Sequence, residues 1–416
     1  MLFHTQSILV SLGLFLSNMP LQSAVTEYND TELSIISEAK VLAGDEDSFD
    51  SFGFTVCVDG DTALVGVYDD DLLDASGNDY LQDAGSVYVF VRNNGVWSEQ
   101  AKLVASDRAC NDFFGCSVSI SGDTALVGAY GDDIVIGDSG EPISDAGSSY
   151  VFVRSNGVWS EQAKLVASDV SNGEDFFGYS VSISGNTALV GAYRDDIVCG
   201  DSGPTTYDAG SSYVFVRSNG VWSEQAKLVA SDGEYKDFFG YSVSISGNTV
   251  LVGAYRDDII IGDSGDLISD AGSSYVFVRN NGVWSEQAKL VASDVSDGEH
   301  EDFFGYSVSI SGNTALVGAY RDEIVISDTG PTISNMGSSH VFVRSNGVWS
   351  EQTKLVASDG NYEGYFGRSV SISGDTALVG AYNPLNYMPG SEGSAYFYKF
   401  GFVSANESPV SVADNH

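Results

Sequence analysis

The sequence predicts an all-β fold built from six copies of one four-stranded unit. The first observation is a Phe-Gly pair that recurs about every 62 residues along the chain. The six pairs lie at 52–53, 114–115, 177–178, 239–240, 304–305 and 366–367. The second is that the segments between them alternate apolar and small polar residues, as β-strands do. The third is that such a unit cannot bury its apolar face alone, so the copies must stack on one another.

The third copy shows the elements of the unit in order. Residues 177–184 alternate apolar and small polar side chains, and a Gly-Asn turn joins them to a second strand at 187–193. A loop then leads to a third strand at 211–217, and an Asn-Gly turn leads to a fourth at 221–230. The second strand is almost wholly apolar, which predicts burial on both faces, whereas the polar residues of the fourth predict an exposed outer strand.

Four-stranded sheets repeated around an axis form a β-propeller, so the sequence predicts six antiparallel blades. Residues 36–43 match the fourth strand of the other copies with one deletion, and the sixth copy supplies only three strands. We therefore expect the N-terminal strand to complete the last blade and close the ring. The predicted divisions are a signal peptide at 1–24, a linker at 25–35, the propeller at 36–400 and a polar tail at 401–416.

Composition and the N-terminal segment limit the classes of function that this chain can have. The chain has 58 acidic and 18 basic residues and a formal charge of −40, which excludes a nucleic-acid partner held through phosphate contacts. The apolar run at 8–16, followed by small residues up to Ala24, predicts a secretory signal and is too short to span a bilayer. No second apolar run follows, so no membrane span is expected. In an extracellular compartment, Asn29 and Asn406 are candidate glycosylation sites.

The two short motifs of each copy resemble a known repeat. Phe-Gly at the start of the first strand and Gly-Ala-Tyr at the end of the second resemble the FG-GAP repeat of integrin α-subunit propellers and of acidic FG-GAP repeat proteins. The resemblance covers nearly all of residues 36–400 and implies a non-catalytic, often adhesive or ligand-binding, extracellular propeller. Three features depart from the integrin pattern: Tyr replaces Pro, the calcium loop between the first two strands is missing, and there are six units instead of seven. Integrin metal sites are therefore not transferred to this chain.

Antiparallel connectivity should gather most of the acidic residues on one face. The loops between second and third strands, and those between blades, must lie at the same end of the strands. In four copies the first of these loops carries an acidic pair and a third Asp five residues later. These residues are Asp132, Asp133 and Asp138; Asp195, Asp196 and Asp201; Asp257, Asp258 and Asp263; and Asp322, Glu323 and Asp328. Oxygen ligands on such loops suit Ca²⁺, although diffuse association of counter-ions would serve the same charge.

The chain contains short motifs that are typical of enzymes, but the other catalytic residues that these motifs require are missing from the repeat. Gly-Asp-Ser-Gly occurs three times and is similar to the nucleophile segment of chymotrypsin-like proteases, but no His accompanies it. His300 lies in a loop between blades, and His340 stands where sister copies have Tyr, so neither predicts a zinc site. A carboxylate pair for glycoside hydrolysis requires a blade that breaks the repeat, and only the loop at 383–392 does so.

The sequence thus predicts a secreted or cell-surface module that binds an extracellular protein or glycan through an acidic face, with Ca²⁺ as its expected cofactor. The alternative is a structural building block of an extracellular coat or matrix. A hydrolase or lyase acting on polysaccharide is the third reading. Neither the partner nor the oligomeric state follows from the sequence.

Overall fold

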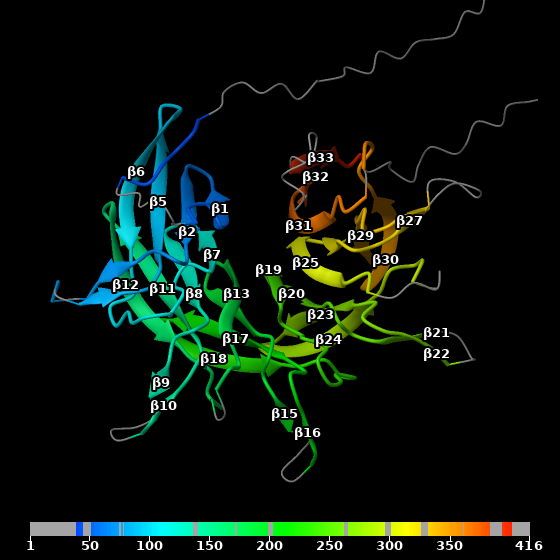
Figure 1. The fold of residues 1–416 in the computed structure, drawn as a ribbon, viewed down its shortest axis with the longest axis horizontal. Coiled ribbons are helices and arrows are strands. Elements are labelled where there is room, and N and C mark those ends of the chain that lie inside the picture. Colours follow the sequence, from blue (N-terminus) through cyan, green and yellow to red (C-terminus); the bar gives the residue numbers. More distant parts are fainter. Residues whose placement is uncertain are drawn as a thin grey trace, which may run out of the picture. The chain divides into compact units, whose positions relative to one another are not determined.

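A computed structural model describes the chain as an all-β protein. The described residues are 39–44, 51–74, 76–77, 79–135, 140–170, 173–198, 203–261, 265–295, 301–325, 332–360, 362–382 and 393–401. Within the compact unit Val41–His416, six sheets follow one another in chain order around a common centre (Figure 1). The protein is a six-bladed β-propeller, as the repeat predicts.

The blades are built from four classes of strand. The first strands are β1 (Thr55–Asp59), β7 (Ser117–Ser121), β13 (Phe177–Ser184), β19 (Ser242–Ser246), β25 (Phe304–Ser311) and β31 (Phe366–Ser373). The second strands are β2 (Thr62–Val67), β8 (Thr124–Ala129), β14 (Thr187–Ala192), β20 (Thr249–Ala254), β26 (Thr314–Ala319) and β32 (Thr376–Ala381). The third strands are β5 (Ser86–Asn93), β11 (Ser148–Ser155), β17 (Ser211–Ser218), β23 (Ser273–Asn280), β29 (Ser338–Ser345) and β33 (Ser394–Lys399). The fourth strands are β6 (Val96–Leu103), β12 (Val158–Leu165), β18 (Val221–Leu228), β24 (Val283–Leu290) and β30 (Val348–Leu355).

Strand burial agrees with the residue pattern. In blade 3 the sheet order is β13-β14-β17-β18, and each neighbouring pair is antiparallel. Every residue of β14 is buried, whereas β18 alternates exposed and partly buried side chains. The prediction of a second strand covered on both faces and an exposed fourth strand is therefore confirmed.

The long loop after each second strand contains a short hairpin that the sequence analysis did not predict. These hairpins are β3 (Leu72–Leu73) with β4 (Tyr80–Leu81), β9 (Ile134–Val135) with β10 (Pro142–Ile143), β15 (Ile197–Val198) with β16 (Thr205–Thr206), β21 (Ile259–Ile261) with β22 (Asp266–Ile268), and β27 (Ile324–Val325) with β28 (Thr332–Ile333). Strands of two or three residues carry too few alternations for a period-2 pattern to be recognised.

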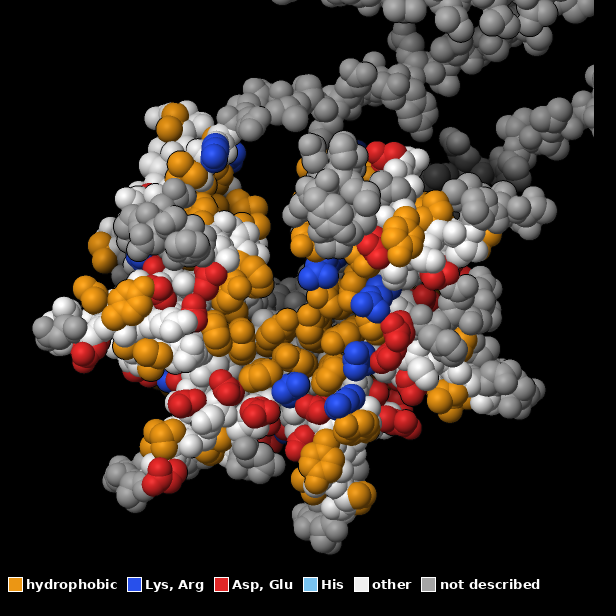
Figure 2. All heavy atoms as spheres, viewed as in Figure 1, with side chains coloured by type: hydrophobic (Ala, Val, Ile, Leu, Met, Phe, Trp, Pro, Cys, Tyr) orange, Lys and Arg blue, Asp and Glu red, His pale blue; other side chains and the backbone are white. Residues whose placement is uncertain are grey.

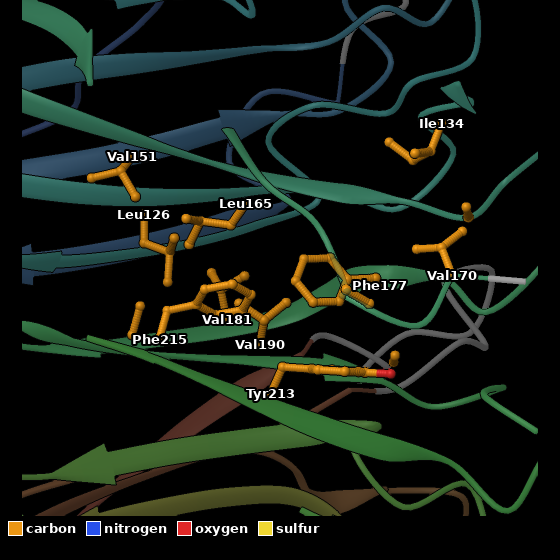
Figure 3. Packing of buried hydrophobic residues seen from close by; sticks show 14 of the residues in the cluster. Leu126, Ile134, Val151, Leu165, Val170, Phe177, Val181, Val190, Tyr213 and Phe215 are labelled. Atoms are coloured by element: carbon orange, nitrogen blue, oxygen red, sulfur yellow. The ribbon is translucent and has the colours of Figure 1, made fainter. Parts of the chain in front are cut away.

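The apolar core lies between neighbouring blades. Figure 3 shows the boundary of blades 2 and 3, where Leu126 and Val151 face Phe177, Val181 and Phe215. All five side chains are buried. The sheets approach closely because second strands carry a Gly at the contact: a Cβ on Gly191 would overlap the carbonyl oxygen of Gly240 in the next blade. The repeated Gly of Gly-Ala-Tyr is thus a requirement of blade packing.

A second set of contacts joins the blades at their outer edge. Each complete fourth strand has a β-bulge, which in β12 leaves Gln162 without a partner in β11. The Gln162 side chain accepts a hydrogen bond of 2.9 Å from Trp222 Nε1 in the next blade. Glu224 of that blade accepts a bond of 3.0 Å from the backbone N–H of Ser168. These contacts explain why Trp and Glu-Gln recur in each copy.

The sixth sheet differs from the other five. Its order is β31-β32-β33, so within the described residues it has three strands, and β33 is an edge. The predicted closure through residues 36–43 is not observed: residues 39–44 form no strand, and residues 36–38 lie outside the described part. Instead, Val41 and Ala43 pack against Val65 and Tyr88 of blade 1, and Glu99 accepts a bond from Gly44 N–H. The segment thus meets blade 1 as the end of a preceding fourth strand would.

Several sequence predictions fall outside the described residues. They are the signal peptide at 1–24, the linker at 25–35, Asn29, Asn406, and all of the tail beyond residue 401. Asp138, Asp201, Asp263 and Asp328, the third acidic residue of each predicted calcium loop, also fall there. In the described part, no helix has the length and hydrophobicity needed to cross a bilayer.

Candidate functional site

The long loops and the blade-linking segments meet at one end of the strands, which we call the loop face. At the boundary of blades 2 and 3, backbone N–H groups of Glu174 and Phe177 donate to carbonyl oxygens of Ser144 and Ala146 at 3.0 Å. Both loop classes therefore contribute to one surface. Figure 2 shows this surface with hydrophobic side chains at its centre, Lys and Arg side chains beside them, and many Asp and Glu side chains farther out.

The centre of the loop face is a chain of aromatic rings, which we call the collar. Two repeat positions supply it: the Tyr that follows the second strand in blades 1 to 5, and the aromatic residue before the Phe-Gly of blades 2 to 6. Phe113 stacks on Tyr130 at 5.0 Å between ring centroids, Tyr130 meets Phe176 at 5.4 Å, and Phe176 meets Tyr193 at 5.7 Å. The collar consists of Tyr68, Phe113, Tyr130, Phe176, Tyr193, Phe238, Tyr255, Phe303, Tyr320 and Tyr365. Neighbouring blades thus share one continuous aromatic surface.

The aromatic residue before each later Phe-Gly adopts an unusual backbone conformation. The φ angle is 55° at Phe176 and 56° at Phe238, in the left-handed region that bulky residues rarely enter. Such a conformation costs on the order of 1–3 kcal/mol and persists where surrounding contacts fix it. Here Phe176 N–H donates to Asp145 O, and Phe177 N–H donates to Ala146 O, both in the preceding blade. The linking loop is therefore held in the form that inserts each ring between two tyrosines.

A second aromatic layer lies beside the collar. It comes from the third position of the Phe-Gly strands, which is Tyr179, Tyr241 and Tyr306 in blades 3 to 5. The Tyr241 hydroxyl lies 3.0 Å from those of Tyr179 and Tyr306. Burial raises the pKa of Tyr179 and Tyr241 well above the ordinary value, so these hydroxyls stay protonated. The same position is Arg368 in blade 6, where the repeat is broken.

Arginine side chains lie against the collar rings. Arg194 lies over Phe176 at 5.2 Å, and Arg321 lies over Phe303 at 5.0 Å. Their side chains are 37% and 39% exposed, and each also pairs with a glutamate of a linking loop, Arg194 with Glu174 at 3.6 Å and Arg321 with Glu301 at 2.8 Å. Arg368 lies over Tyr306 and Tyr382 at 5.5 and 5.0 Å, and no described carboxylate is within ion-pair distance of it. The collar therefore combines aromatic faces with cationic donors.

Comparison with known families agrees with this geometry. A family model described as the FG-GAP repeat matches residues 36–90, 97–152, 159–215, 222–277, 284–342 and 349–398. The chain belongs to the FG-GAP repeat family. A search of curated protein sequences finds no match. Each FG-GAP match starts at or near a fourth-strand position and ends in the third strand of the next blade, so the family unit bridges a blade boundary.

In this FG-GAP propeller, the first carboxylate of each predicted calcium pair is buried in a structural network. Asp132 lies 2.6 Å from Lys164 Nζ and 2.8 Å from the Tyr150 hydroxyl, and Lys164 Nζ lies 2.8 Å from Asp107 of the preceding linking loop. Burial alone would lower the pKa of Lys164, but the two aspartates raise it above its usual value. The same ion pairs join Asp195 to Lys227, Asp257 to Lys289 and Asp322 to Lys354. These carboxylates already have a cationic partner.

The second residue of each pair has a different environment. Asp133 accepts a backbone hydrogen bond of 3.1 Å from Asp145 N–H, and Asp196 and Asp258 accept the equivalent bonds at 2.9 Å. Glu323 is partly exposed beside Asp322. Among the described residues, no three His, Cys, Asp or Glu side chains gather as a metal site. The third residues of the predicted sets lie outside the described part, so defined calcium sites stay a prediction.

The Asp and Glu side chains around the outside of the loop face form what we call the acidic rim (Figure 2). Three more carboxyl groups lie in the linking loops beneath it, two of them buried and one partly buried. Burial, together with smaller contributions from the neighbouring charges of Asp132, Asp195 and Asp257, raises the pKa of Asp112, Asp175 and Asp237 to about 7. Asp112 also accepts a bond of 2.6 Å from Ala109 N–H, which lowers its pKa in part. These groups share the position before the collar aromatic residue. They make the linking loops sensitive to pH.

Blade 5 contains a Ser-His-Glu arrangement that the sequence analysis did not identify. His340 lies 3.0 Å from Ser338 Oγ through Nε2 and 2.9 Å from Glu351 through Nδ1. However, Ser338 and His340 are completely buried, and Ser338 donates to Asp322 as the equivalent serines of other blades do. A nucleophile must reach its substrate. His340 thus replaces Tyr in a packing position, as its place in the repeat predicts.

Three of the four cysteines are described, and all three are free thiols. Cys57 is partly buried, Cys110 is exposed and Cys116 is buried. Cys116 occupies the position that holds Tyr179 and Arg368 in other blades. Burial raises the pKa of its thiol to about 12, which keeps it protonated and unreactive.

Proposed function

We propose that the protein is a secreted or cell-surface, non-catalytic binding module that holds an extracellular protein or glycan against the collar. The observation that carries this proposal is the continuous aromatic surface at the centre of the loop face, with partly exposed arginine side chains lying against it. Aromatic faces pack against sugar rings and against apolar or aromatic side chains. Guanidinium groups pair with carboxylate or sulfate groups in a bidentate manner.

The acidic rim gives the collar selectivity. Carboxylates outside the arginines repel strongly anionic partners and attract basic ones, since the chain carries a charge of −40. A partner that fits has a single acidic group for the arginines and neutral or basic surroundings. A neutral glycan chain with an occasional uronate, and a protein loop with one carboxylate inside a basic patch, both meet this description.

Calcium enters the proposal as a rim counter-ion. The first carboxylates of the predicted sets are paired with lysines, so the groups that remain for cations are the second ones, of which Asp133 is exposed. We therefore propose that Ca²⁺ associates with the rim and reduces its self-repulsion. This association supports the fold and the partner contact without a catalytic role.

The test is a comparison of two surface variants. The labelled protein is screened on a printed glycan array and on a panel of extracellular protein domains, and affinities are then measured for saturable binders. Arg256→Ala combined with Arg321→Ala removes two collar guanidinium groups, and we expect at least a tenfold loss of affinity. Arg92→Ala, on the hairpin-turn face where Arg92 pairs with Asp61 at 2.7 Å, is the matched control. Equal binding by the collar variant and the control would falsify the proposal.

The alternative is a structural building block of a coat or matrix. One observation favours it, namely the exposed apolar side chains of Val56 and Val58 at one end of the blade series and of Phe397 at the other. Catalysis has less support, because the one Ser-His-Glu arrangement among the described residues has a completely buried serine and histidine.

A further inference from the structure

Blade 1 and blade 6 each have one sheet face that is exposed, although the equivalent face of every other blade is covered by its neighbour. At the boundary of blades 5 and 6, Ser309 and Ser311 accept bonds of 3.0 Å from the N–H groups of Ile372 and Gly374. Ser307 also donates to Gly367 O at 2.7 Å. The equivalent serines of blade 6 are Ser369, Ser371 and Ser373, which are exposed. No hydrogen bond joins them to blade 1 within the described residues.

Apolar side chains show the same difference. Val118 and Ile120 of β7, at the boundary with blade 1, are 9% and 6% exposed. Their counterparts in β1, Val56 and Val58, are 69% and 63% exposed. On the other end, Phe397 of β33 is 64% exposed, although its counterpart in each complete blade is buried. Apolar groups of this size are expected to be covered by a partner surface.

The backbone confirms that blade 1 does not rest on blade 6. At the boundary of blades 5 and 6, a Cβ on Gly318 would overlap the carbonyl oxygen of Gly367 in the next blade. A Cβ on the equivalent Gly380 of blade 6 would contact only Ser369 of its own sheet. A hollow of about 600 Å³, lined by Phe54, Arg368, Ser369 and Gly380, lies there instead. In Figure 1, β1 and β31 lie on opposite sides of the opening between the first and last blades.

We propose that blade 6 of one copy accepts blade 1 of a second copy, head to tail. The two surfaces fit each other because they repeat the surfaces that join neighbouring blades within the chain. Blade 1 and blade 6 of one chain leave each other's apolar groups exposed, so the place is open to blade 1 of a second copy. The matching groups, Val56, Val58 and Phe397, are uncharged on a chain of charge −40, so copies meet with least repulsion at these ends.

The geometry of this contact predicts open assemblies. The surface on blade 1 differs from the surface on blade 6, so each added copy leaves one free end of each kind. Within the described residues β33 is an edge strand, so its outer backbone groups are available on the blade 6 side to an incoming strand. Assembly of this kind is independent of partner binding at the collar.

The first experiment measures mass by light scattering over a range of protein concentrations. We expect the wild type to exceed the chain mass of 44.0 kDa increasingly with concentration. Val56→Asp should remain at 44.0 kDa with an unchanged melting temperature, because Val56 is exposed within one copy. Val158→Asp is the control: Val158 has nearly the same exposure, 68%, but it lies at the start of β12 in blade 2, away from both ends of the blade series. A wild type that stays monomeric overturns the proposal.

The second experiment distinguishes a second copy from closure of one chain. Val56→Cys and Phe397→Cys are prepared separately on a background with Cys110→Ser, since Cys110 is the exposed native thiol among the three described. Mixing them under mild oxidation should give a disulfide-linked pair that neither protein forms alone. If the double variant instead forms its disulfide within one chain and the mixture yields no pair, the chain closes on itself and the proposal fails.

Discussion

The buried carboxyl groups of the linking loops predict that this protein is more stable at pH 5 than at pH 8. The pKa of Asp112, Asp175 and Asp237 is about 7 in the folded chain, mainly through burial, against about 3.9 in an unfolded one. Between these values the folded state holds protons that the unfolded state has lost. Stability must then decrease as pH rises through this interval.

The magnitude follows from the shift. One pKa unit corresponds to about 1.4 kcal/mol, so a shift of about three units is worth up to about 4 kcal/mol for a single group at pH 8. Asp112 is 2% exposed, so solvent screens this cost little. Asp112→Asn removes the charge and keeps an acceptor for Ala109 N–H. The new amide N–H₂ must itself be buried, so we expect a net gain of about 1–2 kcal/mol at pH 8.

The assay is chemical denaturation at pH 5 and pH 8. At pH 5 the folded wild-type carboxyl is already protonated, so Asp112→Asn should no longer stabilise the protein, and the buried amide should lower the unfolding free energy by about 1 kcal/mol. Asp107→Asn is the control with the opposite sign. Burial alone would raise the pKa of Asp107, but the hydrogen bonds from Lys164 and Tyr150, together with the Lys164 charge, outweigh this effect and lower the pKa below its usual value. The charged form of Asp107 therefore stabilises the fold above about pH 4. The reasoning is refuted if Asp112→Asn destabilises the protein equally at both pH values.

Three further predictions follow from the blade contacts and the rim. Gly191→Ala should lower the unfolding free energy by about 3 kcal/mol in denaturant titration, because the new Cβ meets the backbone of Gly240. Gly380→Ala should lower it by less than about 1 kcal/mol, because only the Ser369 hydroxyl must move. Equal losses would contradict an uncovered blade 6. Gln162→Ala should cost about 1 kcal/mol and alter tryptophan fluorescence, because Trp222 loses its acceptor; unchanged fluorescence would argue against the bond. Millimolar Ca²⁺ and Mg²⁺ should raise the melting temperature equally if the rim binds counter-ions diffusely, whereas an effect of Ca²⁺ alone would show defined sites.

The strands could be predicted because their signals are local. In the third copy, the first and second strands were expected at 177–184 and 187–193, and the structure has Phe177–Ser184 and Thr187–Ala192. Alternation of side chains and the Gly-Asn turn are both contained within a few residues. The closing strand at 36–43 was inferred from its similarity to the fourth strands and from the missing fourth strand of the sixth copy. Its described part forms no strand, although it contacts blade 1.

The environment of the acidic pairs could not be predicted, because it depends on sheet register. Asp132 and Lys164 are 32 positions apart, and they meet only because Tyr150 pairs with Lys164 across β11 and β12. The recurrence of Lys in every complete fourth strand was a usable signal, since a buried cation requires a partner. The collar depends on a left-handed Phe176, and no pattern of hydrophobicity reveals that conformation.

Charge separates the two surfaces on which this protein can meet others. Many carboxylates lie around the loop face (Figure 2), so two copies that approach through their loop faces repel each other. The blade ends at Val56 and Phe397 are apolar, so association at these ends buries apolar area without bringing the acidic rims together. Head-to-tail contact therefore leaves the collar of every copy open. A chain of copies would then present several collars in a row, and a partner with repeated groups, such as a glycan polymer, would bind more tightly to the assembly than to one copy.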